Sequence, residues 1–238
     1  LADEIMAHDI DQGFALIRPP GHHAGIGRGQ GFCVLNNVAI TAEHLRRKYG
    51  LSRILIVDFD AHHGNGTQDI FYDTNEVMFL SVHQQDIFPF SGQADQAGES
   101  KGEGYTINVP VYAQFGDNEY TYLFGHLLQI VCTQYLPQII LVSAGYDAHV
   151  DDTISQICLT TQWYKNVTMM LRFYAQKICH KQLLMILEGG YNPNCLEPCV
   201  LTCLDGLLEK PAEPVGVPLS QRAQRLLQDH PFQQFWTL

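Results

Sequence analysis

Short apolar runs alternate along the chain with stretches in which apolar residues recur every three to four positions. The apolar runs are rich in Ile, Leu and Val, and they predict strands at 14–17, 54–57, 77–82, 105–109, 139–142 and 183–187. The intervening stretches predict helices at about 36–48, 66–72, 118–135, 160–180 and 195–208. Continuous apolar strands that alternate with helices are typical of parallel sheets. We therefore expect an α/β fold, with an open parallel sheet and helices on both faces.

Two segments lack this periodicity. Residues 83–104 are rich in Gly and Gln and predict a long surface loop. Residues 209–238 form a Pro-rich C-terminal tail with a short helix and an apolar end, which we expect to pack on the domain. The chain starts at Leu1 in what looks like the middle of a helix, without an initiator methionine. We therefore interpret residues 1–238 as a single catalytic domain that lacks its N-terminal section.

Composition narrows the classes of partner. The chain carries 14 Lys and Arg against 25 Asp and Glu, a net charge of −11, which argues against nucleic acid or an anionic membrane and would attract a cationic substrate. No apolar run is long enough to span a bilayer. The seven cysteines are odd in number and lack C-x-x-C pairs, so they indicate neither a disulfide framework nor a thiolate zinc site. This pattern fits the reducing cytoplasm.

Polar clusters directly follow four of the predicted strands. They occupy residues 18–23, 58–64, 143–147 and 188–191. In open α/β sheets, ligands bind outside the carboxyl ends of the strands. Because these ends meet at one edge of the sheet, we expect the four clusters to converge in space.

The cluster after the second strand has the residue types of a metal site. In an extended strand, Asp58, Asp60 and His62 would share one face. Asp60, His62 and Asp147 are the best three-ligand set, and three protein ligands with an open fourth position are the catalytic pattern for zinc. The oxygen-rich set also suits Fe(II) or Co(II). Residues 58–64 alone would fit a buried ion-pair network equally well, but the coincidence of four clusters favours a metal.

Two adjacent histidines, His22 and His23, follow the rigid Pro-Pro-Gly turn at the same edge. One imidazole can take a proton from water and return it to a leaving amine. Asp58 and Asn65 are available to orient the two rings and tune their basicity. His63 has a weaker claim, and we expect it to have a supporting or structural role.

Tyr191 follows Gly189 and Gly190, which permit a close approach of the backbone to the site. A phenol at this position could polarise a carbonyl and stabilise an oxyanion opposite the metal. Taken alone, Tyr191 would more simply be a buried tyrosine bonded to the backbone. The neighbouring clusters favour the catalytic interpretation.

Five motifs occur in a fixed order: RPPGHHA, GFCVLNN, DFDAHHGNGTQ, SAGYDAH and LEGGY. With them, the chain strongly resembles the histone deacetylase and acetylpolyamine amidohydrolase superfamily from about residue 14 to residue 208. The resemblance implies an arginase–deacetylase fold and zinc-dependent hydrolysis of an acylated amine.

The resemblance also assigns roles by motif position. It implies zinc ligands at Asp60, His62 and Asp147, an acid/base pair at His22 and His23, and an oxyanion donor at Tyr191. The narrow substrate tunnel would be lined by Gly31, Phe32, Phe88 and Ile154. A structural monovalent cation, potassium, would be held by Asp58, Asp60, Ser81 and the backbone carbonyls of His62 and Val82.

Three departures from the family pattern refine this expectation. Asn65 stands where one branch places an aspartate, which makes the chain class II-like, and we expect a deacetylase of bacterial type. Ile154 is apolar where a polyamine-selective member has an acid. This favours acylated lysine in a protein or peptide, with acetylated polyamine as the alternative. The section before RPPGHHA is much shorter than the family norm, which puts substrate grip and autonomous folding in question.

Two other functions fit the sequence less well. The binuclear manganese ureohydrolases share the fold, but their second metal needs aspartates where this chain has Gly64 and His149. A non-catalytic acyl-lysine-binding module would be indicated by the loss of a ligand, a histidine or the tyrosine. None of these residues is lost.

Overall fold

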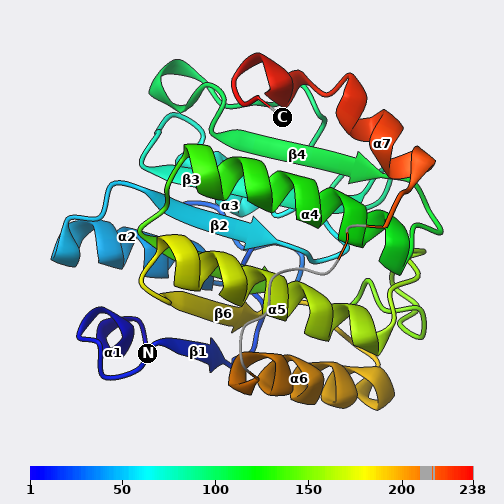
Figure 1. The fold of residues 1–238 in the computed structure, drawn as a ribbon, viewed down its shortest axis with the longest axis horizontal. Coiled ribbons are helices and arrows are strands. Elements are labelled where there is room, and N and C mark those ends of the chain that lie inside the picture. Colours follow the sequence, from blue (N-terminus) through cyan, green and yellow to red (C-terminus); the bar gives the residue numbers. More distant parts are fainter. Residues whose placement is uncertain (210–215, 217, 238) are drawn as a thin grey trace.

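The computed structural model describes residues 1–209, 216 and 218–237. Within them, six parallel strands form one sheet in the order β1-β6-β5-β2-β3-β4 (Figure 1). The strands are β1 (Gln12–Ala15), β2 (Ile54–Asp58), β3 (Val77–Gln84), β4 (Thr106–Val111), β5 (Ile139–Ala144) and β6 (Leu183–Leu187). All six predicted strands and the open parallel sheet are confirmed.

One helix precedes the first strand, and the others lie between and after the strands. They are α1 (Ala2–Met6), α2 (Asn37–Tyr49), α3 (Asn65–Phe71), α4 (Asp117–Gln134), α5 (Thr161–Ile178), α6 (Pro193–Leu208) and α7 (Gln221–Gln228), with 3₁₀ turns η1 (Ser100–Gly102) and η2 (Pro231–Gln234). The five helices predicted at 36–48, 66–72, 118–135, 160–180 and 195–208 are confirmed, with ends shifted by at most two residues. None of the described helices is both long and apolar enough to cross a membrane.

The two faces of the sheet bury separate apolar layers. Leu55 and Val57 of β2 belong to the layer beneath α4 and α5, whereas Ile54 and Ile56 belong to the layer beneath α2. Figure 1 looks onto α4 and α5, which run along the strands in front of the sheet, with α2 behind it. Every residue of β2 is therefore buried, which explains the unbroken apolar run at residues 54–57 before Asp58.

The strand order reverses direction between β2 and β5. From β2 the chain continues outward to β3 and β4, and from β5 it continues the other way to β6. The two strands are direct neighbours, with Asp58 opposite Ser143. A crevice at the carboxyl ends of such a pair is the usual ligand position in open α/β sheets.

The loop after β3 is less superficial than predicted. β3 extends through Gln84, so the loop begins later, and its middle is tied to the core. His83 Nε2 donates to the Gly92 carbonyl (3.0 Å), and His63 Nδ1 lies 2.8 Å from Ser91 Oγ. The His63 ring also contacts the His83 ring, with centroids 4.7 Å apart and the ring planes tilted by 44°. His63 thus helps to hold this loop, which is the structural one of the two roles expected for it.

The described part of the tail packs on the domain, as predicted. Phe232 is buried, and His230 Nε2 donates to the Asn108 carbonyl (2.7 Å). Trp236 Nε1 donates to the Gly104 carbonyl (2.6 Å). Most of the Pro-rich segment, residues 210–215 and 217, lies outside the described residues.

Candidate functional site

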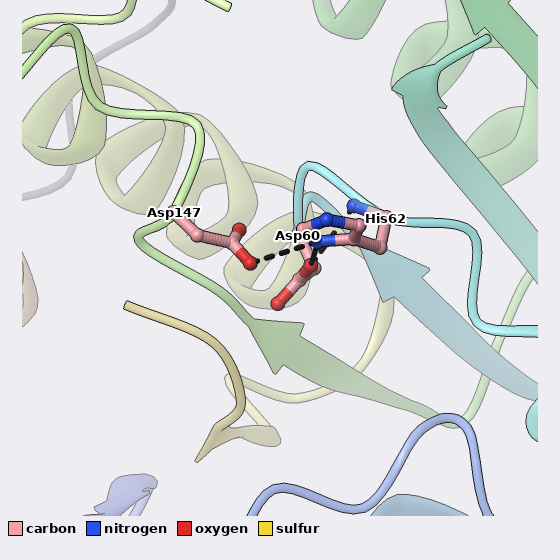
Figure 2. Close-up of side chains that lie close together, drawn as sticks. All are labelled: Asp60, His62 and Asp147. Atoms are coloured by element: carbon pink, nitrogen blue, oxygen red, sulfur yellow. Dashed lines mark hydrogen bonds and ion pairs between the residues drawn. The ribbon is translucent and has the colours of Figure 1, made fainter. Parts of the chain in front are cut away.

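Three buried side chains at the β2/β5 crevice form a compact group of the metal-ligand type. Asp60 and His62 follow β2, and Asp147 follows β5 (Figure 2). His62 Nδ1 lies 2.9 Å from Asp147 Oδ2 and 3.2 Å from Asp60 Oδ1. Ligand atoms of the three residues lie within 4.8 Å of one another, and the described residues contain no other such group. The predicted three-ligand set is thus brought together.

The way in which these residues converge differs from the prediction. β2 ends at Asp58, so an extended strand does not place Asp58, Asp60 and His62 on one face. Instead, Asp58 Oδ1 accepts from Asp60 N (3.1 Å), and Asp60 Oδ1 accepts from His62 N (2.9 Å). Such short side-chain-to-backbone bonds bend the chain. As a result, Asp58 contacts His22, whereas Asp60 and His62 meet Asp147.

The two buried carboxylates of this group require a positive charge nearby. Asp60 and Asp147 are each 1% exposed. Burial, together with the neighbouring Asp60, raises the pKa of Asp147 to about 6. Burial opposes charge on His62, but the carboxylates of Asp147 and Asp60 outweigh it and raise the His62 pKa to about 10. A proton on His62 thus offsets part of the negative charge of two carboxylates, and a divalent cation ligated by a neutral imidazole would offset all of it.

Backbone N–H groups fix both carboxylates. Gly189 N donates to Asp60 Oδ2 (2.8 Å), and Ala61 N donates to Asp147 Oδ1 (2.9 Å). A Cβ on Gly189 would lie 2.3 Å from Asp147 Oδ2, and one on Gly145 would lie 2.1 Å from Asp60 Oδ2. Only glycine allows this approach, so these glycines are part of the site's construction.

His22 and His23 are adjacent to this group and have different partners. His22 Nδ1 is 2.9 Å from Asp58 Oδ2, and His23 Nδ1 is 2.9 Å from Asn65 Oδ1, as predicted. Burial opposes charge on His22, but Asp58 and Asp60 outweigh it and raise its pKa well above the ordinary value. Burial and the charge of His22 lower the pKa of His23 to about 3. The neighbouring carboxylates therefore favour the charged form of His22, whereas burial favours the neutral form of His23.

Glu188, which follows β6, holds the turn that carries the histidine pair. Its Oε2 accepts hydrogen bonds from Gly21 N and from His22 N, the latter at 3.0 Å. The side chain is fully buried, and burial raises its pKa to about 7. The sequence placed Glu188 at the sheet edge but did not indicate this contact. The one feature of the sequence that could have suggested this contact is the position of an acidic residue directly after a buried strand.

A cavity of about 350 Å³ connects these groups with the surface. It is lined by His23, Gly31, Phe32, His62, Ile87, Phe88, Ile154 and Tyr191. The four predicted tunnel residues are therefore present, and Ile87 was missed. His23, His62 and the Tyr191 hydroxyl supply polar groups to an otherwise mainly apolar lining. The cavity therefore suits an apolar stem that ends in a polar group.

Tyr191 contributes a protonated phenol to this cavity. Its ring lies 5.7 Å from that of Phe32, centroid to centroid. Burial, followed by the charges of Asp60 and Asp147, holds the pKa of Tyr191 above its ordinary value. The hydroxyl is therefore a hydrogen-bond donor at neutral pH.

A larger hollow of about 860 Å³ lies against α2. Its apolar lining includes Ile26, Val34, Leu35 and Ile40. Neither the metal-ligand group nor the histidine pair lines it. We therefore place the candidate site in the smaller cavity, where the chemistry is concentrated.

The side chains expected around a structural cation are close together. Asp58 of β2 pairs in register with Ser81 of β3, and both are buried, as is Val82. Ser81 Oγ lies 2.8 Å from His83 Nδ1. The cation itself stays a prediction.

Comparisons with known proteins agree with this geometry. The family model described as histone deacetylase domain matches residues 1–207. The chain is 44% identical to Histone deacetylase 14, chloroplastic, of Arabidopsis thaliana, over 87% of this chain and 50% of that protein. It is 42% identical to a probable deacetylase of Archaeoglobus fulgidus, over 80% of this chain and 53% of that protein.

A human relative and a solved structure extend the comparison. Polyamine deacetylase HDAC10 of Homo sapiens is 37% identical over 92% of this chain and 33% of its own length. The crystal structure of the HDA15 HD domain superposes with a TM-score of 0.89 at 35% identity, covering 99% of this chain and 65% of that one. The chain thus spans about half the length of the first two relatives. By sequence and by fold, it belongs to the histone deacetylase family.

Proposed function

We propose that this chain is the catalytic domain of a zinc-dependent amidohydrolase that removes acetyl, or longer acyl, groups from the ε-amine of lysine in proteins or peptides. The observation that carries the proposal is the position of the Asp60/His62/Asp147 group beside a mainly apolar cavity. Family membership supports deacetylation as the class of reaction.

The three-residue group would hold the metal. Asp60, His62 and Asp147 supply one imidazole and two carboxylates and leave a position open, which fits catalytic zinc, with Fe(II) or Co(II) as alternatives. When bound, the ion supplies Lewis-acid chemistry, because it polarises a carbonyl and makes water a stronger acid.

The histidine pair would transfer the protons. With its Nδ1 donating to Asn65 Oδ1, neutral His23 keeps a free lone pair on Nε2 to accept a proton from the attacking water. The same ring would then return the proton to the leaving amine. His22, paired with Asp58, would stay charged and hold its neighbour in place.

Tyr191 would donate its hydroxyl proton in a hydrogen bond to the oxyanion that develops at the substrate carbonyl. Phe32 and Phe88 would exclude water around the stem of the substrate. Acylation removes the charge of a lysine amine, so its four-methylene stem can enter this lining without desolvating an ammonium group.

An acetylated polyamine is the second candidate substrate. The human relative named as a polyamine deacetylase and the net charge of −11 both favour it. Against it, a free polyamine amine needs a carboxylate partner near the cavity, and Ile154 supplies none. We therefore rank acyl-lysine first.

We also propose a structural potassium ion bound by Asp58, Asp60, Ser81 and the backbone carbonyls of His62 and Val82. The burial of these residues and the register of Asp58 with Ser81 support this position. A cation there would balance the negative charge of Asp58.

Turnover on three substrate classes tests the proposal. We expect a higher kcat/KM for an acetyl-lysine peptide than for N-acetylputrescine or N-acetylspermidine, with longer acyl-lysine peptides as the third class. A polyamine preference of about tenfold or more, the equivalent of about 1.4 kcal/mol, would overturn the lysine assignment. A zinc-loaded protein that turns over none of them would overturn the proposed activity.

A further inference from the structure

The turn that carries Tyr191 is held from two sides by charged residues that belong to other segments. On one side is the buried carboxylate of Asp152, in the segment after β5. On the other is the guanidinium of Arg18, an exposed residue just after β1. Neither side chain lines the cavity.

Asp152 binds the donors of the turn. Its Oδ2 accepts from Tyr191 N (2.7 Å) and from Asn192 N (3.1 Å). Its Oδ1 accepts from Ile154 N (3.2 Å), so one carboxylate joins two segments of the cavity wall. Asp152 is 4% exposed, and a buried carboxylate with three N–H donors is a strong, geometrically specific link.

Arg18 binds the acceptors of the same turn. Its Nη1 donates to the Glu188 carbonyl (3.0 Å), and its Nη2 donates to the Gly190 carbonyl. Its guanidinium carbon also lies 5.5 Å from the centre of the Tyr191 ring. The planar fork of arginine presents N–H groups to two carbonyls in a fixed geometry, whereas the ammonium of a lysine is a point charge on a flexible stem.

We propose that Asp152 and Arg18 are positioning residues that together set the location of the Tyr191 hydroxyl. The turn benefits from such support because Gly190 has a positive φ of 116° and Tyr191 is 42% exposed, so burial alone does not fix the position of the ring. The clamp fixes the N–H groups after Gly190 and the carbonyls around it. This inference rests on the proposed role of Tyr191 as oxyanion donor.

A double-mutant cycle tests the clamp. Asp152→Asn keeps the shape but removes the charge, and it should lower kcat about 10- to 100-fold, because a misplacement of about 1 Å can cost 10²-fold. In the Tyr191→Phe background, where no hydroxyl remains to be positioned, the same change should lower kcat by less than about threefold. Asp151→Asn is the matched control. The Asp151 carboxylate is next to Asp152 in the sequence, but it is exposed and contacts none of these N–H groups.

The outcomes separate the clamp from the proposed function. If Asp152→Asn reduces kcat by the same factor with and without the hydroxyl, Asp152 is merely structural and the clamp is wrong, while the amidohydrolase proposal survives. A Tyr191→Phe variant as active as the parent would instead overturn the role of the hydroxyl, and the clamp with it.

Arg18→Met provides an independent arm, because Arg18 is exposed and its loss should not prevent folding. We expect Arg18→Met to lower kcat about as much as Asp152→Asn does in the parent protein. In the Tyr191→Phe background, this loss should disappear. If Asp152→Asn fails to fold, this arm decides. An effect of Arg18→Met that is equal in both backgrounds overturns the clamp.

Discussion

The metal-ligand group and the Tyr191 turn contact the same cavity but are stabilised differently. Asp60 and Asp147 directly follow neighbouring strands, are 1% exposed, and each accept a hydrogen bond from the backbone. Tyr191 is 42% exposed and lies on a glycine-containing turn held from outside by Asp152 and Arg18. The first arrangement follows from the sheet, and the second depends on contacts between loops.

Because the two regions are supported differently, they should respond differently to substitution. Removing a member of the buried group takes away a ligand that no nearby side chain can replace, so function should be lost entirely. Changes in the cavity wall should reduce the rate or shift selectivity in a graded way, because the metal-ligand group stays intact.

Asp147→Ala should have the largest effect. We expect it to abolish turnover and zinc binding, because the ligand set falls from three to two. Zinc content per chain and kcat, measured on the same preparation, check this. Asp151→Ala removes an equal charge from an exposed position close by and should retain both. An Asp147→Ala protein that still turns over would place the chemistry elsewhere.

Tyr191→Phe should have the next largest effect. Loss of one oxyanion donor usually lowers turnover about 10²–10³-fold, and the metal should stay bound because Tyr191 is outside the ligand group. Steady-state kinetics with a zinc assay distinguish the two. Activity within a factor of a few of the parent would show that the phenol is structural.

Gly31→Ala should disturb the wall next to His23. The new Cβ would lie 2.4 Å from His23 Cδ2 and 2.8 Å from Phe88 Cε1, so either ring must shift, and we expect a loss of about 10²-fold in kcat/KM. Gly27→Ala is the control, because its φ is also positive but nothing lies within 4 Å of the added carbon. Equal losses for the two variants would attribute the effect to backbone strain alone.

Ile154→Glu should have the smallest effect on catalysis and a measurable effect on selectivity. A carboxylate at this place on the wall would pair with the free amine of a polyamine, and we expect the ratio of kcat/KM for N-acetylspermidine over acetyl-lysine peptide to rise about tenfold. Ile154→Gln, of the same size and uncharged, is the control. An unchanged ratio would show that Ile154 does not select the substrate.

The sheet and the metal-ligand group were predictable because their signals are local. Unbroken apolar runs marked the strands, and the strand-end rule brought Asp60 and His62 together with Asp147 although they are far apart in sequence. Even so, the expected reason was wrong for Asp58, since β2 ends there and the chain bends. The boundary depends on hydrogen bonds that strand periodicity does not contain.

The supports of the site could not be predicted from local patterns. No local pattern distinguishes Asp152 in the sequence, and its bonds to Tyr191 N and Asn192 N exist because two loops meet. Glu188 likewise acts on the turn at Gly21, which is far away in sequence. Such contacts form only when the whole sheet packs, so the local pattern of one sequence does not predict them.

Removing and restoring the metal is the most direct test of the central claim. The chain would be stripped with a chelator, shown to be metal-free, and assayed on an acetyl-lysine peptide before and after one equivalent of zinc is added. We predict that release of acetate and free lysine peptide stops in the metal-free protein and returns with zinc. Sustained turnover by verified metal-free protein would contradict the account.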